Sequence, residues 1–217
     1  MVLKTQPSLI DQLRPALSDD RVGSYLKAAG FDPDRALALY LWNAQIGEAF
    51  HLPLQAVEVS LRNRISSAFA AVFGPDWWRD PDFRRIAGPE RIDDIELVVR
   101  RLTDKHRVVN TGQIVSGLSF GFWVALLQAR YNPKVWSAQL KLAFPHLPLG
   151  KARSDIAYAA SRIAFLRNRI SHHEPLIRLD LSAFYADAMA LLEWVWPLKA
   201  RWIRPHCRVP PLLRSKP

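Results

Sequence analysis

A helical repeat of apolar residues between positions 53 and 73 is the feature that most constrains how this chain can fold. Apolar side chains recur there every three or four residues, at Leu54, Val57, Leu61, Ile65, Ala68 and Val72. This spacing gathers them on one face of an amphipathic helix, which must bury that face against other elements. Glu58 and Arg62, four residues apart with the acid first, fit an ion pair on its polar side. We therefore expect a helical core built around this segment.

The remaining chain is predicted to form further helices, separated by proline and glycine. No run of useful length alternates apolar and polar residues with the period of two that strands require. Proline fits the first turn of a helix but disrupts a helix interior, so Pro53 is expected to divide two helices. We expect helices to begin at or near Pro33, Pro53, Pro89, Pro133, Leu149 and Asp180. Connecting segments are expected at residues 76–89, 110–113 and 145–148.

The chain is predicted to have three parts. Residues 1–31 are expected to form a helical lead-in that covers the core, and residues 32–197 a single helical domain. Within that domain, residues 116–131 are mostly apolar and expected to be buried, with Gly117 and Gly121 allowing close helix contact. Residues 198–217 are basic, rich in proline and free of acids, so we expect an extended or mobile tail.

The composition is that of a soluble globular protein with a strong excess of positive charge. The 217 residues are 49% hydrophobic, and the formal net charge is +10. Such a charge attracts polyanions such as nucleic acid, although a basic protein can also carry charge that binds nothing. No apolar run approaches the roughly 18 residues of a membrane span, and no secretory signal is visible. With one cysteine, Cys207, no intrachain disulfide can form, so we expect a cytoplasmic protein without membrane contact.

Residues 167–175, which read RNRISHHEP, place two arginines, an asparagine, a serine, two histidines, a glutamate and a proline in nine positions. They directly follow the apolar helical run 156–166, and Pro175 disfavours helical geometry at Glu174, so the helix should end within the cluster. One interpretation is structural, because cations at a helix C-terminus interact favourably with the helix dipole. The other is a site that binds or cleaves RNA.

The cluster contains the groups that metal-independent RNA cleavage needs. An imidazole can take up and release a proton under physiological conditions, so His172 can deprotonate a ribose 2′-hydroxyl or protonate a leaving 5′-oxygen. Arg167 carries a permanent charge in a planar fork suited to a phosphate, and Asn168 can orient the imidazole or bind a phosphate oxygen. Such a reaction leaves a 2′,3′-cyclic phosphate and needs neither metal nor cofactor. The HExxH spacing, a cysteine cluster, a phosphate-binding glycine loop and a GxSxG turn do not occur.

The helical repeat places the two principal residues of this cluster apart. Asn168 and His172 are four residues apart and lie on one face. Arg167 and His172 are five apart, about 140° around the helix. They converge only if the helix end unwinds or if a second subunit supplies the partner group. The hexapeptide LRNRIS occurs at 61–66 and again at 166–171, which is either chance or a sign that two helices present similar polar ends to one site.

With these residues in view, the sequence resembles the Abi-like (abortive infection) proteins of the HEPN superfamily. The resemblance rests on four stretches in the family's order: LYLWNAQIGEAF at 39–50, VEVSLRNRIS at 57–66, GLSFGFWVALL at 117–127 and FLRNRISHHEP at 165–175. It implies an all-α, HEPN-like helical bundle with additional N-terminal and connecting helices. It also implies an RxxxxH motif, formed here by Arg167 and His172, with Asn168 as the polar residue after the arginine.

The resemblance further implies an endoribonuclease in which two motifs, often from two subunits, face one cleft. A homodimer acting in phage defence by abortive infection, or as a toxin restrained by an antitoxin, is the expected context. Some HEPN domains have no activity and only bind RNA or a protein, and this alternative stays open. A DNA-associated helical regulator is a third reading, which charge alone supports.

Other residues are candidate substrate contacts. They are His173, Arg169, Glu58, Arg62 and Asn63. Trp77, Trp78 and the basic tail can also contact RNA by stacking and charge, and a core position for the tryptophans is the alternative.

Overall fold

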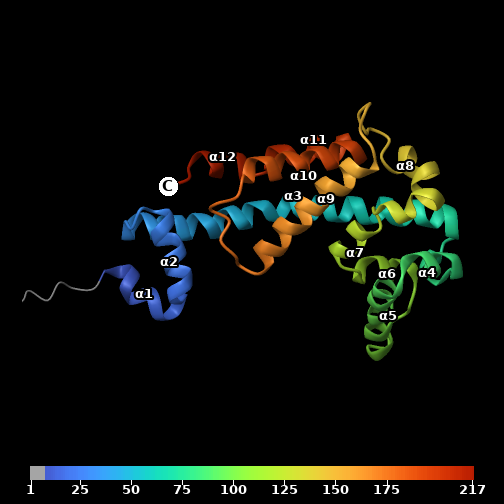
Figure 1. The fold of residues 1–217 in the computed structure, drawn as a ribbon, viewed down its shortest axis with the longest axis horizontal. Coiled ribbons are helices and arrows are strands. Elements are labelled where there is room, and N and C mark those ends of the chain that lie inside the picture. The colour runs from blue at the N-terminus through green and yellow to red at the C-terminus, as the bar shows by residue number, and fades with distance from the viewer. Residues whose placement is uncertain (1–7) are drawn as a thin grey trace, which may run out of the picture.

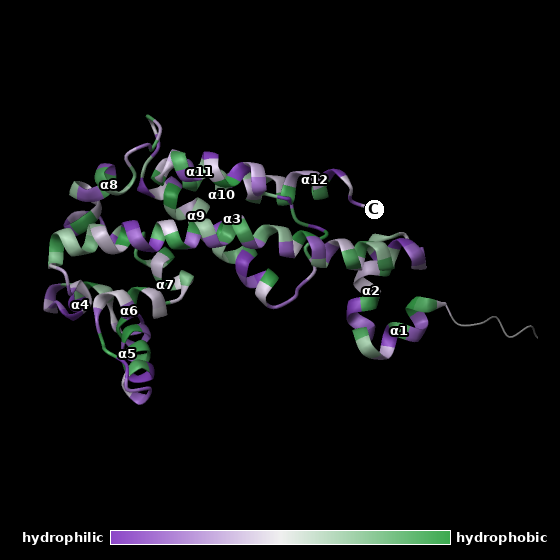
Figure 2. Cartoon of the chain, turned by 180° about the vertical axis from the view of Figure 1, so that it is seen from behind, coloured by the Kyte–Doolittle hydropathy of each residue, from purple (hydrophilic) through white to green (hydrophobic). Residues whose placement is uncertain are grey.

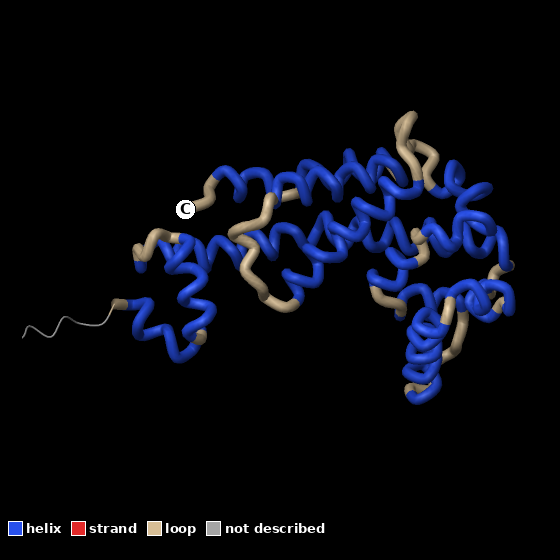
Figure 3. Tube along the Cα trace, viewed as in Figure 1, coloured by secondary structure: helices blue, strands red, loops and turns tan. Residues whose placement is uncertain are grey.

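The computed structural model describes residues 8–217, which form helices joined by short loops (Figure 1). No strand occurs among these residues, as the tube in Figure 3 shows, so the predicted all-α class is confirmed. The N-terminal seven residues, part of the predicted lead-in, lie outside the described region.

The long helix α3 (Pro33–Phe73) is the axis of the molecule. Its 41 residues span about 62 Å at 1.5 Å per residue. Asp32 caps its start, because one carboxylate oxygen accepts hydrogen bonds from the backbone N–H groups of Asp34 and Arg35, both at 3.0 Å. The helix ends at Gly74, whose positive φ of 88° suits glycine.

The prediction that Pro53 divides two helices is wrong, since α3 passes through it without a break. An internal proline costs about 3 kcal/mol, because it removes one hydrogen bond and crowds the preceding turn. Pro53 is itself buried, between the buried Phe50 and Leu54. Burial of the helix on both sides of the proline outweighs the local cost.

The first half of α3 packs against the N-terminal helices α1 (Leu9–Leu17) and α2 (Asp19–Ala28). Tyr25 of α2 is almost fully buried and meets Tyr40 of α3 edge to face, with ring centroids 5.3 Å apart. Residues 8–31 of the predicted lead-in therefore form two helices that pack against α3.

The second half of α3 carries an aromatic core. Phe69 lies at its centre, and its ring is within 6.0 Å of five others, Phe73, Trp77, Phe83, Tyr131 and Trp136. These rings come from α3 itself and from the segment between its end and residue 136. The elements of that segment are η1 (Trp77–Arg79), α4 (Pro81–Ala87), α5 (Pro89–Asp104), α6 (Thr111–Gly117), α7 (Phe120–Ala125), η2 (Ala129–Tyr131) and η3 (Asn132–Trp136).

In this region the structure decides between the two positions open to Trp77 and Trp78, and it corrects the expected loop 110–113. Trp77 and Trp78 are buried and donate to the hydroxyls of Ser66 and Thr111, both at 3.1 Å, so neither tryptophan offers a face for RNA stacking. The predicted loop 110–113 begins a helix instead, because the Asn110 side chain caps α6 by accepting from the backbone of Gln113.

A second layer lies along α3 and contains the chain from residue 153 to the C-terminus (Figure 1). Helix α8 (Ser137–Ala143) leads through the predicted loop around Pro145 and Pro148 into α9 (Arg153–Ser171). Helix α10 (Leu181–Val195) packs on both α3 and α9.

The C-terminal tail is helical and packed, so the expectation of an extended tail is wrong. It forms α11 (Pro197–Ile203), η4 (Arg204–His206) and α12 (Val209–Arg214). Val209 is fully buried, and the indole of Trp42 donates to the carbonyl of Leu212 at 2.8 Å. Part of the tail's charge is used within the fold, as Lys216 donates to the carbonyl of Ile177 at 2.7 Å.

Apolar and polar residues are interspersed along the helices, including α3 and α9 (Figure 2). Among residues 8–217 no helix is both long and apolar enough to cross a membrane.

The segment 116–131 contains the end of α6, the helix α7 and the turn η2, so Gly117 and Gly121 do not share one helix face as expected. Gly117 ends α6 against α5, where an added Cβ atom would lie 2.6 Å from Cγ1 of Val98. At Gly121 the nearest atom would be the Ser119 hydroxyl at 3.7 Å, which is ordinary contact.

We expect Gly117→Ala to lower the free energy of unfolding by about 1–3 kcal/mol, because the new methyl group overpacks the α5–α6 contact. Gly121→Ala, the matched control, should be neutral or should stabilise by up to about 1 kcal/mol through helix propensity. Urea unfolding followed by circular dichroism measures both. Equal effects of the two substitutions would contradict close packing at Gly117.

Candidate functional site at the end of helix α9

The C-terminal end of α9 is fully formed, and the predicted position of its end is correct. The helix continues to Ser171, and the backbone N–H of His172 still donates to the carbonyl of Asn168 at 2.9 Å. The residues from Arg167 to His172 therefore keep their helical spacing. Arg167 and His172 are expected to converge only through unwinding of the helix end or through a second subunit. The helix end is not unwound in this structure.

A Schellman motif terminates this helix. His173 takes a left-handed conformation with φ of 54°, and its N–H donates to the carbonyl of Ile170 at 3.0 Å. The N–H of Glu174 reaches back to the carbonyl of Arg169 at 2.9 Å. These two hydrogen bonds satisfy carbonyls that a helix end otherwise leaves unpaired.

Arg169 braces the same turn from its side chain. Its guanidinium lies 2.9 Å from the carboxylate of Glu174 and donates to the carbonyl of Pro175 at 2.8 Å. Arg169, expected as a substrate contact, thus engages Nη1 and Nη2 within the turn, whereas its buried Nε atom has no hydrogen-bond partner among the described residues.

The three residues expected to be catalytic lie at the surface of this rigid end. Arg167 is partly exposed, and Asn168 and His172 are exposed, whereas the preceding Leu166 is fully buried and anchors the helix. The Arg167 guanidinium donates to the amide oxygen of Asn168 at 3.3 Å. Its Nε atom lies 3.9 Å from the carboxylate of Glu58 on α3.

Only one of the three α3 candidates lies beside this motif. This residue is Glu58, whose carboxylate faces the Nε atom of Arg167. Among the described residues, Glu58 makes no ion pair with Arg62. The Nε atom of Arg62 is buried without a hydrogen-bond partner. Asn63 lines a different groove, with Trp196 and Lys199.

The repeated hexapeptide does not mark two helix ends. Residues 61–66 lie inside α3, whereas residues 166–171 form the end of α9. In both copies the leucine is buried, the asparagine is exposed and the isoleucine is at least half-buried, which explains the shared pattern through packing.

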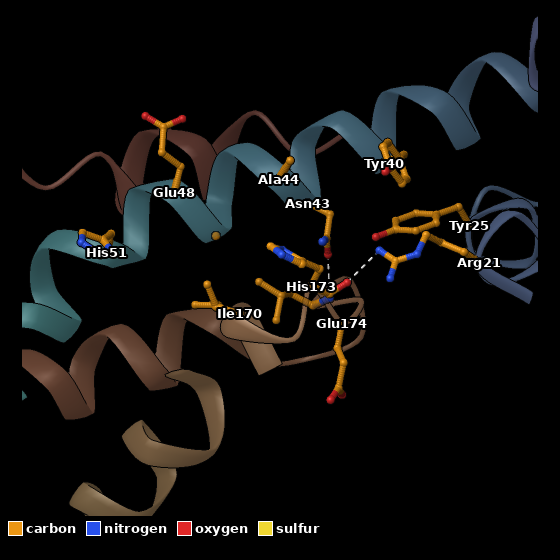
Figure 4. Close-up of a pocket in the computed structure, with 12 residues that line it drawn as sticks. Arg21, Tyr25, Tyr40, Asn43, Ala44, Glu48, His51, Ile170, His173 and Glu174 are labelled. Carbon is orange, nitrogen blue, oxygen red and sulfur yellow. Dashed lines mark hydrogen bonds between the residues drawn. The ribbon is translucent and has the colours of Figure 1, made fainter. Parts of the chain in front are cut away.

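Beside the motif, a groove of about 420 Å³ lies between α2, α3 and the turn that follows α9 (Figure 4). His173 faces it, together with Arg21, Tyr25, Asn43 and His51. Arg21 of α2 closes one end by donating to the carbonyl of His173 at 2.8 Å. The side-chain oxygen of Asn43 accepts from the N–H of Leu176 at 2.6 Å and so fixes the turn to α3.

Sequence reasoning missed most of this groove. Asn43 and Glu48 lie in the stretch 39–50, which resembles the family but reads as a packing pattern. Arg21 and Tyr25 come from the lead-in, where no local signal distinguishes them from other surface or core residues.

Tyr25 differs from the other groove residues because its hydroxyl is buried without a hydrogen-bond partner. Burial raises the pKa of Tyr25 to about 12, although the nearby Arg21 acts in the opposite direction. The hydroxyl therefore keeps its proton at neutral pH and is available as a donor.

Within residues 8–217 no three histidine, cysteine, aspartate or glutamate side chains gather closely enough to hold a metal ion. Comparisons of the chain with protein-family models, with curated proteins and with solved structures found no match. The family resemblance stays a prediction from the sequence motifs.

We expect His173→Gly to raise the free energy of unfolding by up to about 1 kcal/mol, because glycine adopts the left-handed conformation without the cost of a Cβ atom. His172→Gly is the matched control. His172 has an ordinary φ of −93°, so glycine there should lower stability through its greater freedom in the unfolded chain. Thermal unfolding compares the two, and a loss of stability in both variants would contradict strain at His173.

Proposed function

We propose that this protein is a metal-independent endoribonuclease of the HEPN type, with Arg167, Asn168 and His172 as its active residues. The observation that carries the proposal is the placement of these three polar groups at the exposed, well-ordered end of α9. A purely structural helix end would use its polar groups for termination, as Arg169 and Glu174 do. The side chains of Asn168 and His172 take no part in that turn.

The proposed reaction is an attack of the ribose 2′-oxygen on the adjacent phosphorus. A base takes the 2′-hydroxyl proton, the bond from the 2′-oxygen to phosphorus forms, and the bond from phosphorus to the 5′-oxygen breaks. An acid protonates the leaving 5′-oxygen, and the products are a 2′,3′-cyclic phosphate and a 5′-hydroxyl. Arg167 stabilises the charge on the phosphate oxygens in the transition state.

This chemistry favours a homodimer with one shared cleft. One imidazole cannot be deprotonated to act as the base and protonated to act as the acid at the same moment. The helical end of α9 holds only one histidine of the motif, and Arg167 lies on a different face from it. A second copy of the chain would supply the second His172 and an Arg167 on the opposite side of the phosphate.

A non-catalytic module that binds RNA or a protein is the second candidate. The observation in its favour is Glu58, whose carboxylate lies 3.9 Å from Arg167 and partly offsets the charge that a phosphate would meet. For both candidate functions, we propose that the partner is RNA or an antitoxin. We propose phage defence by abortive infection, or toxin activity, as the biological context. Both proposals rest on the family resemblance alone.

We expect the protein to cleave cellular RNA in EDTA, and His172→Ala and Arg167→Ala each to reduce the rate by at least 100-fold, as loss of acid–base catalysis or phosphate stabilisation requires. His206→Ala, which changes an exposed histidine of η4, should cut as well as wild type. Gel electrophoresis of end-labelled RNA measures the rates. Intact RNA with the wild type, or full activity of both site variants, is incompatible with the catalytic proposal.

We expect a dimer with one wild-type and one His172→Ala chain to lose at least about 10-fold in cleavage rate, because a shared cleft needs both histidines. Co-expression with two different affinity tags isolates this mixed dimer. Two independent sites predict half of the wild-type rate instead. A mixed dimer with half the rate, or a fully active monomer, would refute the shared cleft.

A further inference from the structure

The groove beside the α9 turn has an unbalanced set of hydrogen-bonding groups. Tyr25 is 1% exposed, and its hydroxyl has no partner. Figure 4 shows that this hydroxyl points toward His173 and Asn43, into the groove. A buried hydroxyl without a partner is costly, so its position calls for an acceptor that the chain itself does not provide.

The neighbouring polar groups are also donors. Asn43 uses its amide oxygen to hold Leu176, and its amide nitrogen donates to no other described residue. One guanidinium nitrogen of Arg21 donates to the His173 carbonyl, and its other nitrogens form no hydrogen bond within residues 8–217. A ligand that fits here must therefore supply several acceptor atoms.

The acidic residues of the groove do not supply those acceptors. The carboxylates of Glu48 and Glu174 point away from its interior in Figure 4. Glu48 lies 3.3 Å from Arg208, and Glu174 lies 2.9 Å from Arg169. The groove interior thus keeps a positive balance from Arg21, which favours an anionic ligand.

The volume and the apolar lining of the groove limit which anionic ligands can fit. Its volume of about 420 Å³ is far larger than a phosphate group alone needs. Ala44, Gly47, Ile170 and Leu176 add apolar atoms to its lining, together with the ring of Tyr40. A flat, apolar body with an anionic group and several acceptors matches this surface, and an unstacked nucleotide has these properties.

We propose that the groove is a subsite for one unpaired nucleotide of RNA, with Tyr25, Asn43 and Arg21 as the residues that read it. The inference rests on the proposed function, because it takes RNA to be the substrate. His173 faces the groove and directly follows His172, so a nucleotide held there adjoins the phosphodiester that reaches the motif. A base must leave its stack to enter, so the substrate class is single-stranded RNA rather than duplex.

Binding tests this subsite without cleavage. The full-length protein with His172→Ala is titrated in EDTA against a fluorescein-labelled, unstructured 12-nucleotide RNA and against the same RNA annealed to its complement. We expect at least 10-fold tighter binding of the unpaired form by fluorescence anisotropy. Equal affinity for the duplex would overturn the subsite, because paired bases cannot enter the groove.

Two substitutions probe the donors. Tyr25→Phe removes only the unpartnered hydroxyl and should weaken binding of the unpaired RNA about 3–10-fold. Asn43→Asp keeps the oxygen that holds Leu176 but replaces the donors with a negative charge, and it should weaken binding by at least about 10-fold. Unchanged melting temperatures establish that neither variant is unfolded.

Tyr131→Phe is the matched control. Tyr131 also has a buried hydroxyl without a partner, but it lies in the aromatic core around Phe69. We expect wild-type affinity for this variant. If Tyr25→Phe and Asn43→Asp bind the unpaired RNA as tightly as Tyr131→Phe does, the subsite proposal is refuted.

Failure of the subsite and failure of the proposed activity give different results. Binding that depends on Tyr25 and Asn43, in a protein whose wild type leaves RNA intact, supports the subsite and refutes catalysis. Cleavage that depends on His172, with wild-type affinity and cut positions in Tyr25→Phe and Asn43→Asp, supports catalysis and refutes the subsite.

Discussion

Burial of α3 along its whole length is the constraint on which the rest of the structure depends. A helix of 41 residues cannot be stable as an isolated element with an apolar face exposed, so it needs partners at both ends. The aromatic rings around Phe69 cover the C-terminal half, and Tyr25 with the lead-in helices covers the N-terminal half. The C-terminal helices α10 and α12 also pack along α3 and so connect its N-terminal and C-terminal halves. This packing keeps α3 continuous through Pro53 despite the local cost.

The same packing places the end of α9 against α3 and makes it rigid. Asn43 holds the turn through Leu176, Arg21 holds it through His173, and Arg169 braces it from within. A rigid helical end keeps Arg167 and His172 on different faces, so chemistry that needs both on one phosphate requires a second chain. Rigidity at this end thus links the fold to the proposed homodimer and also shapes the groove beside the motif.

Local patterns in the sequence predicted much of the helical content and the helix ends that depend on neighbouring residues. Asp32 and Pro33 begin α3, and the polar cluster before Pro175 ends α9, as expected. The errors occur where distant contacts decide. Pro53 is accommodated by burial, and the tail folds because Trp42 and Val209 bring it against α3.

The sequence by itself determined the all-α class, the apolar faces of the main helices and the cluster from Arg167 to His172, because these follow from residues three to five positions apart. Only the tertiary structure decided that Glu58 lies beside Arg167, that Asn63 faces elsewhere, and that a groove joins the motif to the lead-in. Tyr25, Asn43 and His173 belong to three segments far apart in the chain. No local periodicity relates such residues, and only the packing of α2 and the α9 turn on α3 brings them together.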